Sequence, residues 1–389
     1  MKRIRVGIIY GGRSSEHLVS IRSASSVLAH LDRDRYEPIP IYIFQNGRWT
    51  VPDGPPSAQT EAEAKAYARD HGQPDSRGSR DAHLVASPDN DHALLTIERN
   101  PGPRDGRDQD LALVRGRHLD VVFPVLHGPF GEDGTVQGLL ELANVPYVGA
   151  GVLASAVSMD KAVMKVLFAA RGLRVPAWTV VHAHEWAADR EGILTTLMAR
   201  RILPVFVKPA NLGSSVGISK AKDRNGLAAA IDEAVQYDRK VVVEDAVPAA
   251  REIEVSVLGN ESPEASLPGE IIPSREFYDY EAKYLDDRSQ LIIPAPLDEA
   301  QTTEVRRMAV EAFLAVDGAG MGRVDFLLDR ISGTWFVNEI NTIPGFTTIS
   351  MYPKLWNATG LGYGRLLERL IELALARHAA TRHLRTGVA

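Results

Sequence analysis

This chain of 389 residues contains no cysteine, so disulfides, thiolate catalysis and zinc sites built on cysteine are excluded. Basic residues are not in excess either, because 44 Lys and Arg stand against 50 Asp and Glu. That balance argues against nucleic acid or a membrane surface as the main partner. No apolar run reaches membrane-spanning length, and the N-terminus carries a strand pattern after two basic residues, not a signal peptide. We therefore expect a soluble protein of the cytoplasm.

The length exceeds what one hydrophobic core usually organises, which predicts two or three domains. Apolar residues make up 44% of the chain, enough to fill such cores. Residues 4–10 predict a buried strand, Gly11-Gly12 a turn, and residues 16–31 a helix that Ser14 or Ser15 can cap. A strand, a glycine turn and a helix open many α/β sheets, whose ligands bind where the strands end. The dinucleotide fingerprint GxGxxG is absent.

The rest of the chain predicts further strands and helices. We expect strands at 39–44, near Trp49, at 119–126, 145–148, 179–182, 203–208, from 218, at 241–244, 252–258 and 269–273, and helices at 135–142, 158–170 (capped by Ser158), 186–200, 223–236, 298–316 and 361–377. Residues 53–110 have 94–97 as their only apolar island, so we predict a partly disordered surface insertion there. Residues 276–290, aromatic and charged without a clear period, suit an ordered surface loop that acts as a lid.

The stretch from Gly322 to Gly345 predicts two strands joined by a polar turn. Side chains alternate across a strand, so Arg323 shares a face with Asp325, and Glu339 shares a face with Asn341. Two carboxylates, an amide and a guanidinium thus gather on one side of a hairpin whose other side is apolar. Hard oxygen donors at this spacing suit Mg²⁺, which takes its remaining ligands from water and phosphate. The alternative is a solvated hairpin face with a salt bridge.

A loop of small residues, Gly213 to Gly217, lies between two predicted strands. Its backbone N–H groups can cradle phosphate oxygens, and Lys208 at the end of the preceding strand can add a positive charge. A plain hairpin turn explains the loop equally well by itself. The alternative interpretation of Lys161 is an ordinary surface lysine on an amphipathic helix. Glu244 ends an apolar strand. It could cap an element or accept a hydrogen bond within a hinge, and it could equally accept one from an adenine amine or a ribose hydroxyl.

Seven segments of the chain, in this order, resemble those of D-alanine–D-alanine ligases of the ATP-grasp superfamily. They are G-G-R-S-S-E-H-L-V-S, H-G-P-F-G-E-D-G, S-M-D-K, V-K-P-A-N-L-G-S-S-V-G-I-S-K, F-Y-D-Y-E-A-K-Y, G-R-V-D-F and N-E-I-N-T-I-P-G-F-T. The resemblance covers all three expected domains and does not cover residues 53–110. It implies a three-domain ATP-grasp fold of α/β and α+β class. The expected parts are an N-terminal α/β substrate domain at 1–150 that carries the insertion, a central ATP-grasp domain at 151–247 and a C-terminal catalytic domain at 248–389.

The resemblance also implies a reaction. ATP would phosphorylate the carboxylate of a first D-alanine, and the amine of a second D-alanine would attack the acyl phosphate, giving D-alanyl-D-alanine for peptidoglycan precursors. Phosphorylation turns a poor leaving group into a good one, and cations and fixed N–H groups would stabilise the charge that builds up. ATP is then a substrate, two Mg²⁺ ions (replaceable by Mn²⁺) are the expected cofactors, and a homodimer is the expected assembly.

By the same resemblance, three residues hold the metal ions: Asp325, Glu339 and Asn341. Lys161 and Lys208 would contact phosphate, and the loop at Ser214-Ser215 would cover the γ-phosphate. The nucleoside would meet Glu244, the backbone near Val247, and Glu252. Glu252 is assigned to ribose with Glu254 as its rival, since one extra residue lies in 248–251. Two groups would stabilise the oxyanion: the Arg323 side chain and the Gly345 amide.

The substrate side follows from the same comparison of motifs. Glu16 resembles the anchor of the first D-alanine's ammonium, and His127 lies near that substrate's carboxylate. Glu16, Ser214 and Tyr284 match a hydrogen-bonded triad that links the three domains. The residues that match the binding site for the second D-alanine's carboxylate are Ser350 and Met351. Family members that prefer D-lactate replace Tyr284, so its presence favours D-alanine. His17, next to Glu16, receives no role.

Other interpretations remain open at this point. A variant ATP-grasp ligase would use another second substrate, D-lactate or D-serine, and the substrate-side matches favour the dipeptide ligase over it. A non-catalytic ATP-binding regulator would have lost a metal carboxylate, and none is lost. A two-domain dehydrogenase fits the opening strand and glycine turn but lacks the dinucleotide fingerprint. Two matched residues also have purely structural interpretations. Glu16 fits an acidic residue that the dipole at a helix N-terminus favours, and Tyr284 fits an aromatic residue of the hydrophobic core.

Overall fold

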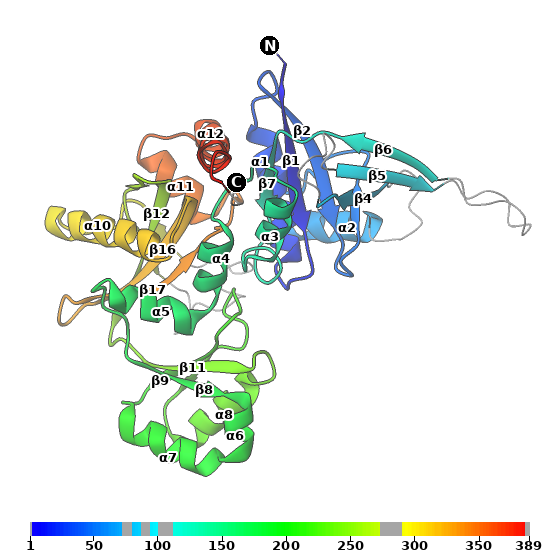
Figure 1. Cartoon of the computed structure of the whole chain (residues 1–389). Coiled ribbons are helices and arrows are strands. Elements are labelled where there is room, and N and C mark those ends of the chain that lie inside the picture. The colour runs from blue at the N-terminus through cyan, green and yellow to red at the C-terminus, as the bar shows by residue number, and fades with distance from the viewer. Residues whose placement is uncertain (1, 72–79, 87–93, 100–111, 273–289, 386–389) are drawn as a thin grey trace, which may run out of the picture.

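The computed structural model describes residues 2–71, 80–86, 94–99, 112–272 and 290–385. Within these residues the strands form three sheets, each with its own helices (Figure 1). The predicted class, a three-part fold of α/β and α+β type, is confirmed. The predicted lid lies outside the described residues except for Gln290. The domain boundaries after residues 150 and 247 stay predictions.

The first sheet has the strand order β6-β5-β4-β3-β2-β1-β7. Its parallel part consists of β1 (Ile4–Gly11), β2 (Tyr36–Ile43) and β7 (Val121–Val125). Its antiparallel part consists of β3 (Trp49–Val51), β4 (Arg80–Leu84), β5 (Leu94–Arg99) and β6 (Ala112–Arg117). The helices of this part are α1 (His17–His30), α2 (Glu61–His71) and α3 (Thr135–Leu142). The predicted strand at 145–148 is reduced to one bridge, between Val122 and Tyr147.

The surface insertion predicted at 53–110 is wrong for the part that the structure describes. Helix α2 packs on α1 with Ala64 fully buried, and strands β4 and β5 extend the first sheet and bury Ala82 and Leu94. The helix buries alanine and the ring of Tyr67 in place of long aliphatic chains, so a search for large apolar residues misses it. Residues 72–79, 87–93 and 100–111 lie outside the described residues.

Two predicted helix caps are also wrong. Helix α1 begins after Glu16, and Ser14 Oγ accepts the Glu16 N–H at 3.2 Å instead of capping the helix itself. The helix predicted at 158–170 is two helices, α4 (Val152–Met159) and α5 (Lys161–Ala170). Asp160 caps α5 by accepting from two backbone N–H groups at 3.1 Å. Asp160, two residues after the expected start, caps the helix in place of Ser158, which lies inside α4.

The second sheet has the order β10-β9-β11-β8 and is antiparallel throughout. Its strands are β8 (Trp178–His182), β9 (Val205–Pro209), β10 (Ser219–Ala221) and β11 (Lys240–Asp245). Its helices are α6 (Ala183–Ala188), α7 (Arg190–Arg200) and α8 (Arg224–Ala234). The helix predicted at 186–200 breaks at Asp189, which caps α7 through the Gly192 N–H at 2.9 Å. This part lies apart from the others, below them in Figure 1.

The third sheet has the order β15-β14-β12-β16-β17, with β13 paired to β12. Its strands are β12 (Ala250–Gly259), β13 (Glu264–Ala265), β14 (Gly269–Ile272), β15 (Gln290–Ile292), β16 (Gly320–Asp329) and β17 (Trp335–Asn341). Helices α5 and α10 (Glu299–Ala315) pack against its apolar face. Two further helices, α11 (Met351–Ala358) and α12 (Tyr363–Thr381), follow in the chain. Among these elements the prediction missed α11, β13 and β15, which are short.

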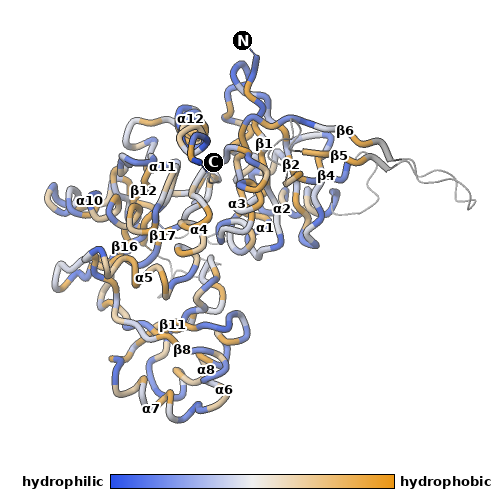
Figure 2. The backbone as a smooth tube through the Cα atoms, viewed as in Figure 1, coloured by the Kyte–Doolittle hydropathy of each residue, from blue (hydrophilic) through white to orange (hydrophobic). Residues whose placement is uncertain are grey.

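The hydrophobic cores follow the three sheets, but one core joins two of them. Val6 and Phe123 of the first sheet pack in a single cluster with Phe346, Leu367 and Leu370 from the C-terminal part. Separate clusters fill the apolar face of the third sheet and the space between the second sheet and its helices. Figure 2 shows hydrophobic residues along the central strands, while helices such as α10 alternate between hydrophobic and hydrophilic, as expected for helices with one buried face.

Candidate functional site

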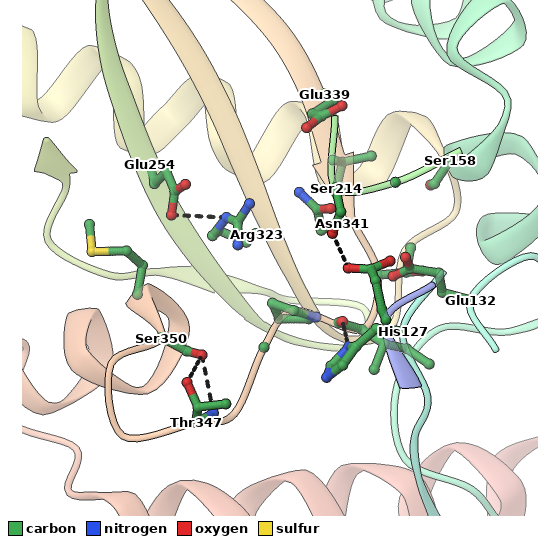
Figure 3. A pocket seen from close by; sticks show the side chains of 18 of the residues that line it. His127, Glu132, Ser158, Ser214, Glu254, Arg323, Glu339, Asn341, Thr347 and Ser350 are labelled. Atoms are coloured by element: carbon green, nitrogen blue, oxygen red, sulfur yellow. Dashed lines mark hydrogen bonds and ion pairs between the residues drawn. The ribbon is translucent and has the colours of Figure 1, made fainter. Parts of the chain in front are cut away.

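A cavity of about 250 Å³ opens where the three parts meet. Its walls come from the α1 start, the loop after β7, the loop between β9 and β10, the β16–β17 hairpin and the segment that leads into α11 (Figure 3). Ten of the predicted site residues line it: Glu16, His127, Lys161, Ser214, Arg323, Glu339, Asn341, Gly345, Ser350 and Met351. The fold thus gathers residues that are more than 300 positions apart in the chain.

The polar face of the hairpin forms one wall, as the alternation predicted. Arg323 stands opposite Asn341, and Asp325 stands opposite Glu339. Arg323 donates two hydrogen bonds of 2.7 Å to the carboxylate of Asp325. Its Nε also lies 3.0 Å from Glu254 Oε2 on the neighbouring strand β12. Burial disfavours the charged guanidinium, but Asp325 and Glu254 outweigh it and raise the pKa of Arg323 well above its usual value.

The donor set of this wall fits a hard divalent cation. Asp325, Glu339 and Asn341 offer carboxylate and amide oxygens on adjacent strands, and Asn341 Nδ2 donates to Asp325 Oδ2 at 3.1 Å. No three His, Asp or Glu side chains in the described ranges gather closely enough to hold a metal alone. The carboxylate and amide oxygens are of the kind that Mg²⁺ prefers, and this ion completes its shell with water and phosphate.

Lysines form a second, deeper group beside the cavity. Lys208 Nζ lies 2.5 Å from Glu244 Oε1, and Lys165 Nζ lies 2.6 Å from Glu244 Oε2. Burial alone would raise the pKa of Glu244, but the two lysines lower it to about 2. Burial, with Lys208 adding to it, lowers the pKa of Lys165. The sequence analysis missed Lys165, although it lies four residues after Lys161 and therefore on the same helix face.

Lys161 is buried, which excludes the alternative of a surface lysine. Its Nζ donates to the carbonyl of Leu212 at 2.6 Å and lies 3.9 Å from Glu339 Oε2. It therefore connects helix α5 to the loop after β9 and to the hairpin. Lys208 makes a similar connection, because it donates to Asn338 Oδ1 at 3.3 Å. Asn338 is the residue at which a β-bulge shifts the register of β16 and β17.

The small-residue loop joins the paired strands β9 and β10, so it is a hairpin turn. Ser214 and Ser215 have left-handed φ angles of 51° and 59°. The Ser214 hydroxyl donates to Glu16 Oε1, which ties the loop to the first part of the chain. A Cβ on Gly213 would lie 3.0 Å from Glu16 Oε2 and 3.8 Å from Glu132 Oε1, so this position faces two carboxylates.

Two buried side chains of the loop after β7 complete this wall. His127 Nδ1 bonds the carbonyl of Ile343 at 3.0 Å, and its Nε2 bonds the hydroxyl of Ser23 at 3.0 Å. Because a carbonyl only accepts, Nδ1 carries the proton, and burial lowers the pKa of the ring. Glu132 accepts the Gly128 N–H at 2.9 Å. Burial and the nearby Glu16 raise the pKa of Glu132 to about 8. Glu132 lies in the segment H-G-P-F-G-E-D-G, but the sequence analysis gave it no role.

The far end of the cavity is built by the segment before α11. Ser350 is the N-cap residue of α11, and its hydroxyl contacts the Thr347 N–H at 3.1 Å and the Thr347 hydroxyl at 2.7 Å. A Cβ on Gly345 would lie 2.7 Å from Ser350 Oγ, so only glycine fits there without a shift. Lys354 also lines this end, and the sequence analysis did not identify it.

The remaining predicted residues lie elsewhere. Six are described but do not line the cavity: Lys208, Ser215, Glu244, Val247, Glu252 and Asp325. Asp325 is joined to the lining through Arg323 and Asn341. Of the two rivals on β12, Glu254 lines the cavity and Glu252 does not. Tyr284 lies outside the described residues.

Comparison with known proteins gives two matching family models and relatives that cover nearly the whole chain. The family models described as D-ala D-ala ligase N-terminus and C-terminus match residues 5–150 and 167–372. A D-alanine–D-alanine ligase of Heliobacterium modesticaldum is 49% identical over 97% of this chain and 96% of its own length. D-alanine–D-alanine ligase A of Bradyrhizobium diazoefficiens is 48% identical over 100% and 99%.

Two solved structures resemble the chain over almost its whole length. The D-alanine–D-alanine ligase of Coxiella burnetii has a TM-score of 0.80 at 36% identity, covering 98% of this chain and 97% of its own. The VanG D-Ala:D-Ser ligase of Enterococcus faecalis has a TM-score of 0.81 at 31% identity, covering 96% and 100%.

Proposed function

This chain belongs to the D-alanine–D-alanine ligase family, and on that premise we propose that it joins two D-alanines with ATP to give D-alanyl-D-alanine for peptidoglycan precursors. The observation that carries the proposal is that one cavity is lined by residues that we assign to phosphate and metal as well as by residues that we assign to the substrates. The first group is Lys161, Ser214, Glu339 and Asn341, and the second is Glu16, His127, Ser350 and Met351. Glu16 and Ser350, which we assign to the two D-alanines, line the same cavity as Arg323 and Gly345. An ATP-binding regulator would need only the nucleotide side.

The first step transfers the γ-phosphoryl group of ATP to a carboxylate oxygen of the first D-alanine and releases ADP. We assign the ammonium of this substrate to Glu16 and its carboxylate to the neighbourhood of neutral His127. Lys161 and Lys208 would hold the phosphates, with Ser214 and Ser215 over the γ-phosphate. Asp325, Glu339 and Asn341 would hold two Mg²⁺ ions, or Mn²⁺ in their place, which neutralise phosphate charge when bound. For the nucleoside we propose Glu244, the backbone near Val247, and Glu252 or Glu254.

In the second step, the amine of the second D-alanine attacks the carbonyl carbon of the acyl phosphate. The amine loses a proton, the tetrahedral intermediate loses inorganic phosphate, and the peptide bond remains. We propose that Arg323 and the Gly345 N–H stabilise the oxyanion, since fixed donors need no reorganisation as charge develops. Ser350 and Met351 would receive the carboxylate of the second D-alanine. The carboxylates of Asp325 and Glu254 support this, because they outweigh burial and keep the Arg323 guanidinium charged.

D-Alanine is the second substrate that the relatives favour. The three D-alanine–D-alanine ligases named above are 49%, 48% and 36% identical to this chain, and the D-Ala:D-Ser ligase is 31% identical. The test is ADP release from ATP and Mg²⁺ with D-alanine, L-alanine, D-serine or D-lactate, each alone and each paired with D-alanine, with products identified by mass. Strong release with D-alanine alone and formation of the dipeptide is the expected result. Release only with a mixed pair would move the function to a variant ligase, and no release from folded, ATP-binding protein would favour the regulator.

We further propose that the enzyme is a homodimer of the cytoplasm, as the family resemblance implies. In the part of the chain that the structure describes, no helix is long and apolar enough to cross a bilayer. Light scattering after size exclusion should give twice the chain mass of 42.5 kDa. A mass of one chain at working concentration would refute the dimer.

A further inference from the structure

A cluster of buried rings lies directly behind the turn between β1 and α1, outside the lining of the cavity. His17, the first residue of α1, is only 2% exposed. Its Nδ1 lies 2.6 Å from the carbonyl oxygen of Gly12, and its Nε2 lies 2.9 Å from the hydroxyl of Tyr42. The steps proposed above for the ligase leave His17 without a role, although it follows Glu16 in the chain.

These two hydrogen bonds settle the protonation of the ring. A backbone carbonyl can only accept, so Nδ1 must carry the proton. Burial lowers the pKa of His17, which favours the neutral ring. In the neutral ring Nε2 is then an acceptor, and the Tyr42 hydroxyl donates to it. Both ring nitrogens are used, so the ring has one orientation.

The acceptor side of His17 has a rigid support. The Tyr42 ring lies 4.9 Å from that of Phe44 and 5.5 Å from that of Tyr67, both edge-on. The Tyr67 hydroxyl in turn bonds that of Tyr10 at 2.6 Å. Tyr67 belongs to α2, in the segment that the sequence predicted to be a surface insertion. Helix α2 therefore helps to hold Tyr42 in place.

The donor side of His17 closes a tight turn. Gly11 and Gly12 have φ angles of 91° and 95°, and the Gly12 N–H bonds the carbonyl of Ile43 at 2.8 Å. A Cβ on Gly11 would lie 2.2 Å from that same carbonyl oxygen. The turn is thus pressed against β2 on one side and held by His17 on the other. Glu16 lies between the turn and His17, and its carboxylate meets Ser214 at the cavity.

We propose that His17 is a positioning residue for Glu16. Its Nδ1–H bond to Gly12 fixes the β1–α1 turn so that the Glu16 carboxylate faces the cavity. His17 thereby tightens the binding of the first D-alanine's ammonium without touching it. This inference rests on the proposed function.

Two substitutions test the hydrogen bonds of the two ring nitrogens separately. In His17→Asn the amide N–H can take the place of Nδ1–H, whereas His17→Gln keeps a polar group only near Nε2. Initial rates over a wide range of D-alanine concentration give the Michaelis constant of the first D-alanine. We expect His17→Gln to raise this constant about fivefold to tenfold, the effect of one lost hydrogen bond, and His17→Asn to stay within about twofold of the wild type. The Michaelis constant for ATP should stay within about twofold in both.

Equal constants in a folded His17→Gln variant and the wild type would overturn the proposal. So would a parallel rise of the ATP constant, since a general loss of structure would affect both substrates. Nitrogen NMR of ¹⁵N-histidine-labelled wild type provides a test that does not depend on how the glutamine variant folds. The His17 signals, assigned by their loss in His17→Asn, should show a protonated Nδ1 and a bare Nε2; the reverse would refute the proposal. Failure of the wild type to form the dipeptide would refute the proposed function, not the role of His17 in the turn that the NMR reports.

Discussion

The third sheet meets its two neighbours in different ways. Its junction with the first sheet is apolar, since Phe123, Phe346 and Leu370 share one buried core. Its junction with the second sheet is mostly ionic and polar, through Lys161 and Lys208, with one small apolar cluster around Ala162. Apolar contacts fix two bodies together without regard to charge, whereas ion pairs can be exchanged for a charged ligand. We infer that the first junction provides stability and the second provides a place for ATP.

The largest effect should come from removing a metal ligand from the polar side. Asp325→Ala should lower turnover at least about a hundredfold while the fold stays intact, because Arg323 and the expected Mg²⁺ lose their carboxylate. Dipeptide formation and thermal unfolding are the two measurements. Asp329→Ala is the matched control, since Asp329 lies on the same strand but bonds only the β16–β17 turn. Near-normal turnover by folded Asp325→Ala protein would remove Asp325 from the site.

The apolar junction should show the opposite pattern. Leu370→Ala, in a fully buried position of α12, should cost about 2–5 kcal/mol of unfolding free energy. At a temperature where the variant is folded, its Michaelis constant for ATP should be unchanged. Leu142→Ala is the control, because Leu142 is 65% exposed and its loss should change stability by less than about 0.5 kcal/mol. Denaturant unfolding measures the unfolding free energy of each variant. Equal losses in Leu370→Ala and Leu142→Ala would refute the stabilising role given to this core.

Lys165→Met sharpens the comparison, since it removes one ion from the polar junction but leaves Lys208 on Glu244. We expect a loss of about 1–3 kcal/mol at pH 7, because Glu244 remains buried and half-paired. The low pKa of Glu244, about 2 against a usual 4.5, means that its pairing stabilises the fold above pH 4.5 and is lost as pH falls toward 2. The gap in unfolding free energy between wild type and variant should therefore narrow over this range. A gap that stays constant from pH 5 to 3 would contradict the pairing.

The last prediction concerns the pH dependence of stability that Glu132 imposes. Its pKa is raised to about 8, so the folded protein binds more protons at this group than the unfolded chain. Stability should then fall as pH rises from about 4.5 to 8 and level off above. Glu132→Gln, which imitates the protonated acid, should remove this part of the slope. Unfolding free energies at pH 5, 6, 7 and 8 give the slope of stability against pH for each protein. Identical slopes in the variant and the wild type would show that Glu132 is ionised in the folded protein.

The sequence predicted the hairpin wall well, because alternation on a strand follows directly from residue spacing. Arg323, Asp325, Glu339 and Asn341 share a face as expected. Spacing could not show Lys165 against Glu244, because that contact joins a helix to a strand far along the chain. Residue spacing also failed to predict α2, whose buried face is made of alanines and Tyr67 without long aliphatic side chains. The sequence analysis missed the Asp160 cap because more than one polar residue near Ser158 could have been the N-cap.

The apolar junction has a consequence for how the protein is made. Strand β1 and helix α12 are among the first and last elements of the chain, yet both bury residues in the same core. During synthesis the part of the first sheet's apolar side that α12 covers therefore stays exposed until α12 (Tyr363–Thr381) has left the ribosome. Contacts of such long sequence separation form slowly, and exposed apolar surface of this kind is prone to aggregation. We expect α12 to set the moment at which the nascent enzyme becomes folded, and truncations before it to yield insoluble protein.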